Sequence, residues 1–249
     1  MNHYQLYYNH IISDGSIQQT PRGLATVGRI DQKFYFNPGE VYTRPGGNPN
    51  IGFIELLQFM SGSFDISTFK KVTPNARLDL FAYQSAYGPR TVNQFDRVLK
   101  ELRSDYDSRR AVLMVANEFD TSKTLPCTLT IQFQVVEGKL WTIVNMRSSD
   151  LIWGLPTDMI QFGGISMMFA NLLGVEVGLC SVNAGNAHVY QETKLKEGQE
   201  FKLSGKFSIP KYKTLDAYSS WALRAVIALE VGSKTIKDIF PLKKETTDE

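Results

Sequence analysis

The chain has 249 residues, of which 43% are hydrophobic and 21% charged, with a formal net charge of +2. This composition is typical of a soluble globular protein with a substantial core, and the small net charge excludes a broad electrostatic surface for a nucleic-acid polymer or an anionic membrane. No apolar run approaches about 18 residues, and the N-terminus lacks a basic region followed by an apolar one. We therefore expect a cytoplasmic protein.

The cysteines and histidines are too few and too scattered for a structural metal site. The chain holds two cysteines, Cys127 and Cys180, and three histidines, His3, His10 and His188. Neither Cys-x-x-Cys nor a clustered Cys/His spacing occurs, and two cysteines cannot form a disulfide framework. We therefore expect no metal ion, and Cys180 is interpreted as a core residue.

Helical and extended patterns alternate in the first part of the chain. Residues 4–12 are apolar on one helical face, and residues 25–36 alternate as strands do. Residues 38–50 are rich in Pro, Gly and Asn, which favours a loop. Residues 51–60 predict a helix that Gly62 ends.

Two charged residues in this part have both a structural and a functional interpretation. Glu55 interrupts the apolar pattern of the helix, so it is either an exposed carboxylate, the simpler interpretation, or a carboxylate directed into a cleft. Arg22 lies in a turn between Pro21 and Gly23 and is most simply a solvated loop charge.

A further helix is predicted after the aromatic, irregular segment 78–88. Thr91 and Gln94 have the spacing of a capping box, and apolar residues recur every three or four positions between 92 and 102.

Arg109 and Arg110 precede a strand predicted at 111–116. Adjacent side chains of a strand point to opposite faces. One arginine could therefore pair internally while the other reaches an anion, or both could extend from a loop.

Cys127 and Arg147 lie at the two ends of a predicted hairpin. Residues 129–135 alternate strictly between apolar and polar, Gly138 marks the turn, and residues 140–146 return. The thiol and the guanidinium are therefore expected near the same end. A neighbouring arginine stabilises the thiolate, which is the nucleophilic form. A reactive cysteine and an inert core cysteine both remain open on this evidence.

The rest of the chain predicts an apolar helix at 156–173, strands at 176–182 and 201–209, a helix at 214–229 and a polar tail at 243–249. Asp158 lies at the start of the first of these helices, where a capping or first-turn role is the structural interpretation. No repeat or linker is found, so we expect a single α+β domain over residues 1–249.

Four segments concentrate the reactive side chains: Leu-Pro-Cys-Thr at 125–128, Asn-Met-Arg-Ser-Ser-Asp at 145–150, Gly-Leu-Pro-Thr-Asp at 154–158 and Gly-Asn-Ala-His-Val-Tyr at 185–190. Their order and spacing resemble the thymidylate synthase superfamily, and within it the deoxycytidylate (dCMP) hydroxymethylase branch. The resemblance is best over residues 87–190 and extends through Glu-Leu-Leu-x-Phe-x-x-Gly at 55–62 back to Arg22. It implies a large mixed or antiparallel sheet flanked by helices, with one sheet face forming a dimer interface.

The resemblance implies a role for each matching residue. Cys127 would add to C6 of a pyrimidine and make C5 nucleophilic towards the methylene carbon of the co-substrate, 5,10-methylenetetrahydrofolate. Glu55 and Tyr87 match residues that organise water and assist proton transfers, and Asp150 and Trp153 match the folate-binding side. The other matching residues bind the nucleotide. Its phosphate would contact Arg22, Arg147 and Ser148, and its sugar hydroxyl would contact His188 and Tyr190. Arg109 and Arg110 match an arginine pair that reaches the phosphate bound in the neighbouring subunit, so the resemblance implies a homodimer.

Asp158 departs from the thymidylate synthase pattern, Gly-Leu-Pro-x-Asn, whose amide matches the O4 acceptor and N3–H donor of uracil. Cytosine presents the opposite pattern, a 4-amino donor beside an N3 acceptor. A carboxyl group can accept from the amino group and, when it holds or shares a proton, donate to N3. A mispaired polar edge costs about 1 to 3 kcal/mol. Asp158 therefore predicts a cytosine nucleotide, and Thr128, at a position where thymidylate synthases have His, agrees.

Two further departures concern the product. The paired tryptophans of the family have no match in residues 78–84, and the C-terminal residues 243–249 are polar instead of apolar. A less sealed site would let water, rather than hydride, reach the methylene intermediate. These departures, together with the resemblance, predict a dCMP hydroxymethylase. The resemblance to that branch implies that it serves a bacteriophage, in its host's cytoplasm. Alternatives are a dCMP or dUMP C5-methyltransferase, a CMP hydroxymethylase, and a non-catalytic nucleotide-binding homologue.

Overall fold

The computed structural model describes residues 2–20, 23–72 and 86–244. Within them, a mixed sheet holds its strands in the order β1 (Ser16–Gln19), β2 (Ala25–Phe36), β8 (Glu176–Tyr190), β6 (Lys139–Met146), β5 (Thr128–Val136) and β4 (Val112–Met114), and β7 (Ser149–Asp150) pairs with β8. β8 runs parallel to β6 and β7, and the other neighbours are antiparallel. A small second sheet joins β3 (Glu40–Thr43) to β9 (Lys202–Lys206).

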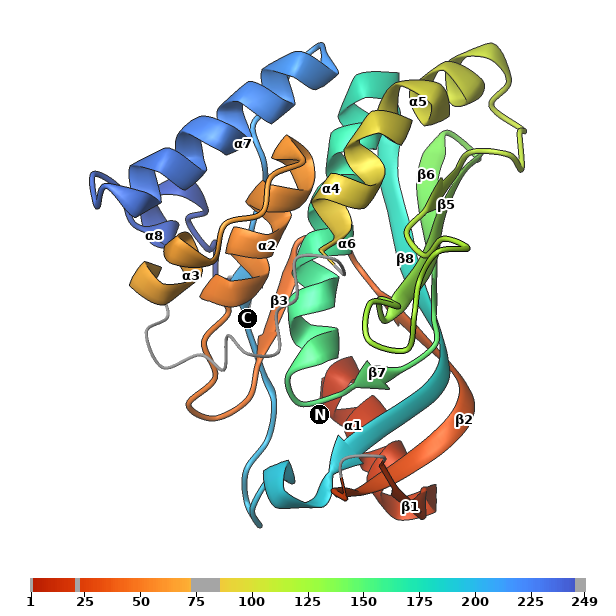
Figure 1. The fold of residues 1–249 in the computed structure, drawn as a ribbon, viewed down its shortest axis with the longest axis vertical. Coiled ribbons are helices and arrows are strands. Elements are labelled where there is room, and N and C mark those ends of the chain that lie inside the picture. Colours follow the sequence, from red (N-terminus) through yellow and green to blue (C-terminus); the bar gives the residue numbers. More distant parts are fainter. Residues whose placement is uncertain (1, 21–22, 73–85, 245–249) are drawn as a thin grey trace, which may run out of the picture.

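The helices gather on one side of the large sheet (Figure 1). Helix α6 (Gly154–Leu173) packs against β6 and β8 and contacts α2 (Asn50–Ser61) and α5 (Phe95–Ser104). Because α6 is enclosed on nearly every side, most of its residues are buried and its apolar side chains form no single stripe. The remaining α-helices in the described segments are α1 (His3–Asp14), α3 (Ile66–Val72), α4 (Tyr87–Thr91), α7 (Leu215–Glu230) and α8 (Ile236–Ile239). None of the helices in those segments combines the length and apolarity that crossing a membrane requires.

The predicted hairpin is confirmed. β5 and β6 pair in antiparallel register, and Glu137 and Gly138 connect them with φ of 52° and 73°. This left-handed conformation is what a two-residue hairpin turn requires. The register ends with Thr128 opposite Met146, so residues 127 and 147 lie beside each other at the far end of the hairpin.

Three local predictions are wrong in part. The loop predicted at 38–50 contains β3, because Val41 is buried and its strand pairs with β9. The capping box at Thr91 and Gln94 does not form, because the chain is already helical from Tyr87; the Thr91 hydroxyl donates to the Tyr87 carbonyl at 2.8 Å instead. The strand predicted at 176–182 continues to Tyr190, because β2 pairs with it along that length.

A buried ion pair fixes the loop that leads to Cys127. Two nitrogens of the Arg90 guanidinium donate to the two carboxylate oxygens of Asp120, at 2.9 and 2.6 Å, and also to the carbonyls of Val115 and Thr124. The Asp120 side chain is 4% exposed although it lies near the surface, and the Arg90 hydrogen bond lowers its pKa to about 2. Arg90 therefore ties α4 to residues 115–124.

Replacing Arg90 with methionine is expected to lower the free energy of unfolding at neutral pH by about 2 to 3 kcal/mol, because it leaves a shielded carboxylate without its charge partner. Lys100→Met is the control: Lys100 pairs with Asp96 at 2.6 Å, but both side chains are more than half exposed. Such a pair contributes less than about 0.5 kcal/mol. Urea unfolding of both variants measures the difference, and equal losses would contradict the assignment.

Candidate functional site

Cys127 and Arg147 lie together, as the hairpin predicts. The Arg147 backbone N–H donates to the Cys127 carbonyl at 2.9 Å. The guanidinium donates from Nε to the Pro126 carbonyl at 3.1 Å and from Nη2 to the Leu125 carbonyl at 3.2 Å. These bonds hold a positive charge beside an exposed thiol, and the other donors of the guanidinium have no hydrogen-bond partner among the described residues, so they can bind an anion.

Cys180 has the opposite environment. It is fully buried in β8, and burial raises the pKa of its thiol to about 12 despite hydrogen bonds with Ser166 and Thr142. The thiol stays protonated, so its interpretation as a core residue is confirmed.

Asp158 lies in the second turn of α6, because the helix begins at Gly154, with Trp153 at the N-cap position. The capping or first-turn interpretation is therefore wrong. The side chain is 6% exposed, and its carboxyl group makes no hydrogen bond or ion pair with any described residue. Burial, followed by the charge of Asp150, raises the pKa of Asp158 to about 7. A buried carboxyl group without a partner is suited to a ligand.

Glu55 of α2 belongs to the same cluster. It accepts a hydrogen bond from Gln161 Nε2 of α6 at 2.8 Å, and burial, then the charge of Asp158, raises its pKa well above the ordinary value. The interpretation of Glu55 as an exposed helix carboxylate is therefore wrong, because α2 packs against α6.

Tyr87 connects this carboxyl cluster to the thiol. Burial raises the pKa of its phenol well above the ordinary value, and the charges of Asp158 and Cys127 act in the same direction. Its ring lies between those of Phe59 and Phe162, at centroid distances of 6.0 and 6.3 Å. The phenol is thus a neutral hydrogen-bond donor close to both the nucleophile and the acids.

Asp150 and Trp153 form another side of the site. Burial raises the pKa of Asp150 to about 6, although the Ile152 N–H donates to its carboxylate at 2.8 Å. The Arg44 guanidinium lies 3.8 Å from the centroid of the Trp153 ring, and its charge also acts on Asp150. Sequence reasoning missed Arg44; its only local signal is an arginine within a Pro- and Gly-rich segment.

His188 and Ser148 meet beside Arg147. The Ser148 hydroxyl and His188 Nδ1 are 3.4 Å apart, and the His188 and Tyr190 rings are in edge contact with centroids 5.2 Å apart. Burial lowers the pKa of His188, and the charge of Arg147 adds to that effect. A neutral imidazole next to two hydroxyl groups is suited to a sugar hydroxyl.

Arg109 and Arg110 lie away from this cluster. Both are exposed before β4, and Arg110 Nε pairs with Glu101 at 2.8 Å. The side chain of Arg109 contacts no hydrogen-bonding or charged group in the described segments. Arg22 and residues 78–84 lie outside the described residues. The other predicted residues are brought together: Glu55, Tyr87, Cys127, Arg147, Ser148, Asp150, Trp153, Asp158, His188 and Tyr190.

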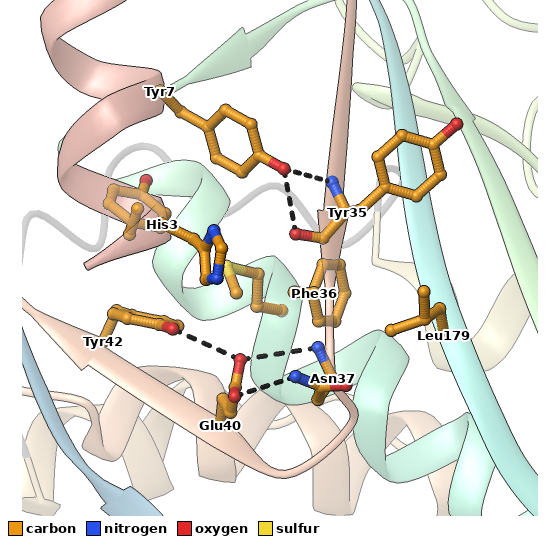
Figure 2. Close-up of a pocket in the computed structure, with 10 residues that line it drawn as sticks. His3, Tyr7, Tyr35, Phe36, Asn37, Glu40, Tyr42 and Leu179 are labelled. Carbon is orange, nitrogen blue, oxygen red and sulfur yellow. Dashed lines mark hydrogen bonds between the residues drawn. The ribbon is translucent and has the colours of Figure 1, made fainter.

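A separate cavity of about 300 Å³ lies between α1, β2 and β3 (Figure 2). Several of its polar groups pair with one another: Glu40 accepts from Asn37 and Tyr42, and the Tyr7 hydroxyl bonds to the backbone of Tyr35. These bonds stabilise the turn into β3, the strand that precedes Arg44. Of the predicted site residues that the structure describes, none lines this cavity.

Comparison with known proteins shows the family of this chain. The family model described as Thymidylate synthase matches residues 2–213. The chain belongs to the thymidylate synthase family. The predicted α+β fold, with a large sheet flanked by helices, is thereby confirmed.

Similar thymidylate synthases include that of Bacillus licheniformis, 35% identical over 117 residues, which are 44% of this chain and 42% of that protein. That of Bacillus atrophaeus is 36% identical over 101 residues (40% and 44%), and that of Corynebacterium aurimucosum is 33% identical over 103 residues (41% and 38%). The chain therefore spans about two-fifths of the length of the curated thymidylate synthases that it matches.

The raised pKa of Asp158 gives this family member a pH-dependent stability. Between pH 3.8 and about 7 the folded chain keeps a proton on Asp158 that the unfolded chain releases, so the unfolding free energy falls as pH rises through that range. Asparagine cannot ionise. We expect Asp158→Asn to be more stable than the wild type by about 2 to 4 kcal/mol at pH 8 and by much less at pH 4. Urea unfolding at both pH values measures this, and an equal difference at both would contradict it.

Proposed function

We propose that this chain transfers a hydroxymethyl group to C5 of a cytosine nucleotide, dCMP, with 5,10-methylenetetrahydrofolate as co-substrate. The observation that carries the proposal is Asp158, a buried carboxyl group without a hydrogen-bond partner among the described residues and with a pKa of about 7. In the Gly-Leu-Pro-x-Asn pattern that this chain resembles, Asp158 stands where thymidylate synthases have the asparagine that reads the base.

A single proton shared between Asp158 and the base favours cytosine. N3 of cytosine is basic and can hold that proton, while the 4-amino group donates to the other carboxylate oxygen. The pair then has the two parallel, charge-assisted hydrogen bonds that make an amidinium–carboxylate contact strong. Uracil has no basic nitrogen at N3, so it gains less from an acid at this position.

The other side chains supply the reaction around C5 and C6. The thiolate of Cys127, stabilised by Arg147, bonds to C6, and the electron pair displaced from the C5–C6 bond makes C5 nucleophilic. Tyr87, as a neutral donor, and Glu55 move protons at C4 and C5. Arg147 and Ser148, together with Arg22, bind the phosphate, and His188 and Tyr190 bind the sugar hydroxyl.

The folate side fits an aromatic, anionic co-substrate. When bound, the folate supplies the methylene carbon at the formaldehyde oxidation level. Trp153 offers a half-exposed aromatic ring. Asp150 is an acid that can bind the amino and N–H edge of a pterin, and Arg44 places a positive charge beside both Trp153 and Asp150.

We propose a homodimer in which Arg109 and Arg110 reach the phosphate of the neighbouring subunit. The sheet face opposite the helices supports this. Gln132 and Ile143 are next in sequence to Phe133 and Thr142, whose side chains contact α6, so they point to the other face, where they and Asn183 remain only partly buried. Arg109 is the better donor, because Arg110 already pairs with Glu101.

Mixing two defective variants tests this arrangement. Arg109→Ala and Cys127→Ser homodimers should each be impaired, whereas their mixed dimer contains one site with an intact thiol and an intact arginine. Random exchange of subunits should therefore restore about one quarter of wild-type activity. Activity no higher than the sum of the separate variants would exclude donation across the interface.

The names of the relatives favour a second candidate, thymidylate-synthase-type methylation of dUMP. Release of the C5 proton from dCMP, dUMP and CMP, with the products weighed by mass spectrometry, separates the possibilities. Release from dCMP with a hydroxymethyl product supports the proposal. A methyl product or preference for dUMP rejects it in favour of the second candidate, and no release from any nucleotide rejects both.

A further inference from the structure

Thr128 carries a fully buried hydroxyl group without a hydrogen-bond partner among the described residues. It is the first residue of β5 and directly follows Cys127. An unpaired buried hydroxyl costs about 1 to 3 kcal/mol, and in folded proteins a bound water or ligand atom commonly accounts for it. Thr68 in α3 and Ser149 in β7 have the same property, but Thr128 is the one next to the nucleophile.

The Thr128 hydroxyl approaches the phenol of Tyr87 and acts to lower its pKa, although no well-aligned hydrogen bond joins the two oxygens. The charges of Asp158, Cys127 and Glu55 act on the same phenol in the opposite direction. The two hydroxyl groups therefore lie close to each other, and the phenol lies within electrostatic reach of both the thiol and the carboxyl groups. Each can donate one hydrogen bond and accept another, so together they offer a water molecule the polar partners that it needs.

We propose that Thr128 and Tyr87 hold the water molecule that supplies the hydroxyl group of the product. The inference rests on the hydroxymethylation proposed above and assigns the side chains that select its outcome. Thr128 is then a specificity-determining residue, because a held water competes with hydride for the methylene carbon on C5.

The step balances without an oxidant or a reductant. The water oxygen bonds to the exocyclic methylene carbon, and one proton of the water passes to Glu55, which acts here in its carboxylate form, a stronger base because burial raises its pKa. The π electron pair of the double bond between C5 and the methylene carbon moves into the ring as a C4–C5 double bond, and the single bond from C5 to that carbon stays. The same pair then re-forms the C5–C6 double bond as the bond from C6 to Sγ breaks. Cys127 leaves as a thiolate, and the nucleotide has gained a hydroxymethyl group in place of its C5 proton.

Thr128→Val tests this role in the full chain with dCMP and methylenetetrahydrofolate, because valine keeps the shape and removes the hydroxyl. We expect C5 proton release to change by less than about threefold, while the hydroxymethyl product per proton released falls at least about tenfold. Thr128→Ser keeps the hydroxyl and should restore the ratio. Thr68→Val, the matched control, removes an equally buried, unpaired hydroxyl outside the site and should leave both quantities unchanged.

The role of Thr128 is overturned if Thr128→Val forms as much hydroxymethyl product per proton released as the wild type, or if Thr128→Ser loses as much of this product as Thr128→Val. Either result leaves the proposed function standing. A wild-type protein that makes only methyl product, or releases no C5 proton, overturns the proposed function and this inference with it. If the valine variant does not fold, Thr128→Ala against Thr128→Ser gives the same comparison, because both lack the γ-methyl group and differ in the hydroxyl.

Discussion

Cys127→Ser is expected to reduce C5 proton release from dCMP by at least about 10³-fold, because a serine hydroxyl at this position would remain protonated and is a far weaker nucleophile than a thiolate. The structure places the thiol at the end of a hairpin, exposed and beside a guanidinium that is held by two backbone carbonyls. Release of tritium from 5-tritiated dCMP measures the effect directly.

Cys180→Ser is the matched control. The Cys180 thiol is buried in the core with a pKa of about 12, so the same substitution there should change proton release by less than about twofold. Brief treatment with iodoacetamide should modify Cys127 and leave Cys180 unmodified in the folded protein, and dCMP should protect Cys127. Equal modification of both cysteines, or full activity in Cys127→Ser, would exclude Cys127 as the nucleophile.

The parts of this site that could be predicted from sequence depend on local pattern. Strict alternation on either side of Gly138 predicts the hairpin, and the hairpin in turn predicts that Cys127 and Arg147 share an end. No contact with a distant segment is needed for that inference. The Gly62 stop of α2 is local in the same way, since its φ of 67° is the left-handed conformation that glycine adopts readily.

The electrostatic centre of the site could not be predicted in this way. Glu55 and Gln161 are 106 positions apart, and only the packing of α2 on α6 shows that the carboxylate is enclosed. Asp158 looked like a capping residue because Thr157 and Asp158 follow a proline, but α6 begins at Gly154 without a side-chain cap. Arg44 directly follows β3 and reaches Trp153, the N-cap of α6, because β3 packs against α6, a contact that a Pro- and Gly-rich segment does not suggest.

Asp158→Asn is expected to reverse the choice of nucleotide. The ratio of kcat/KM for dCMP to that for dUMP should fall by about 10² to 10³, because the amide cannot share a proton with N3 of cytosine. In the orientation that pairs with O4 and N3–H of uracil, the amide also opposes both polar groups of the cytosine edge. Asp150→Asn is the matched control: its carboxyl group is also enclosed, with a pKa of about 6, but it lies on the proposed folate side. It should lower kcat/KM for both nucleotides by a similar factor.

The pH profile separates base recognition from a general loss of structure. If the proton on Asp158 is shared with N3 of cytosine, kcat/KM of the wild type for dCMP should fall as pH rises above about 7, because the ionised carboxylate of the free protein cannot supply that proton. The fall of kcat/KM above pH 7 should be absent when Asp158→Asn acts on dUMP, since an amide does not titrate there. An Asp158→Asn protein that keeps its preference for dCMP and shows the same fall above pH 7 would show that another group reads the base.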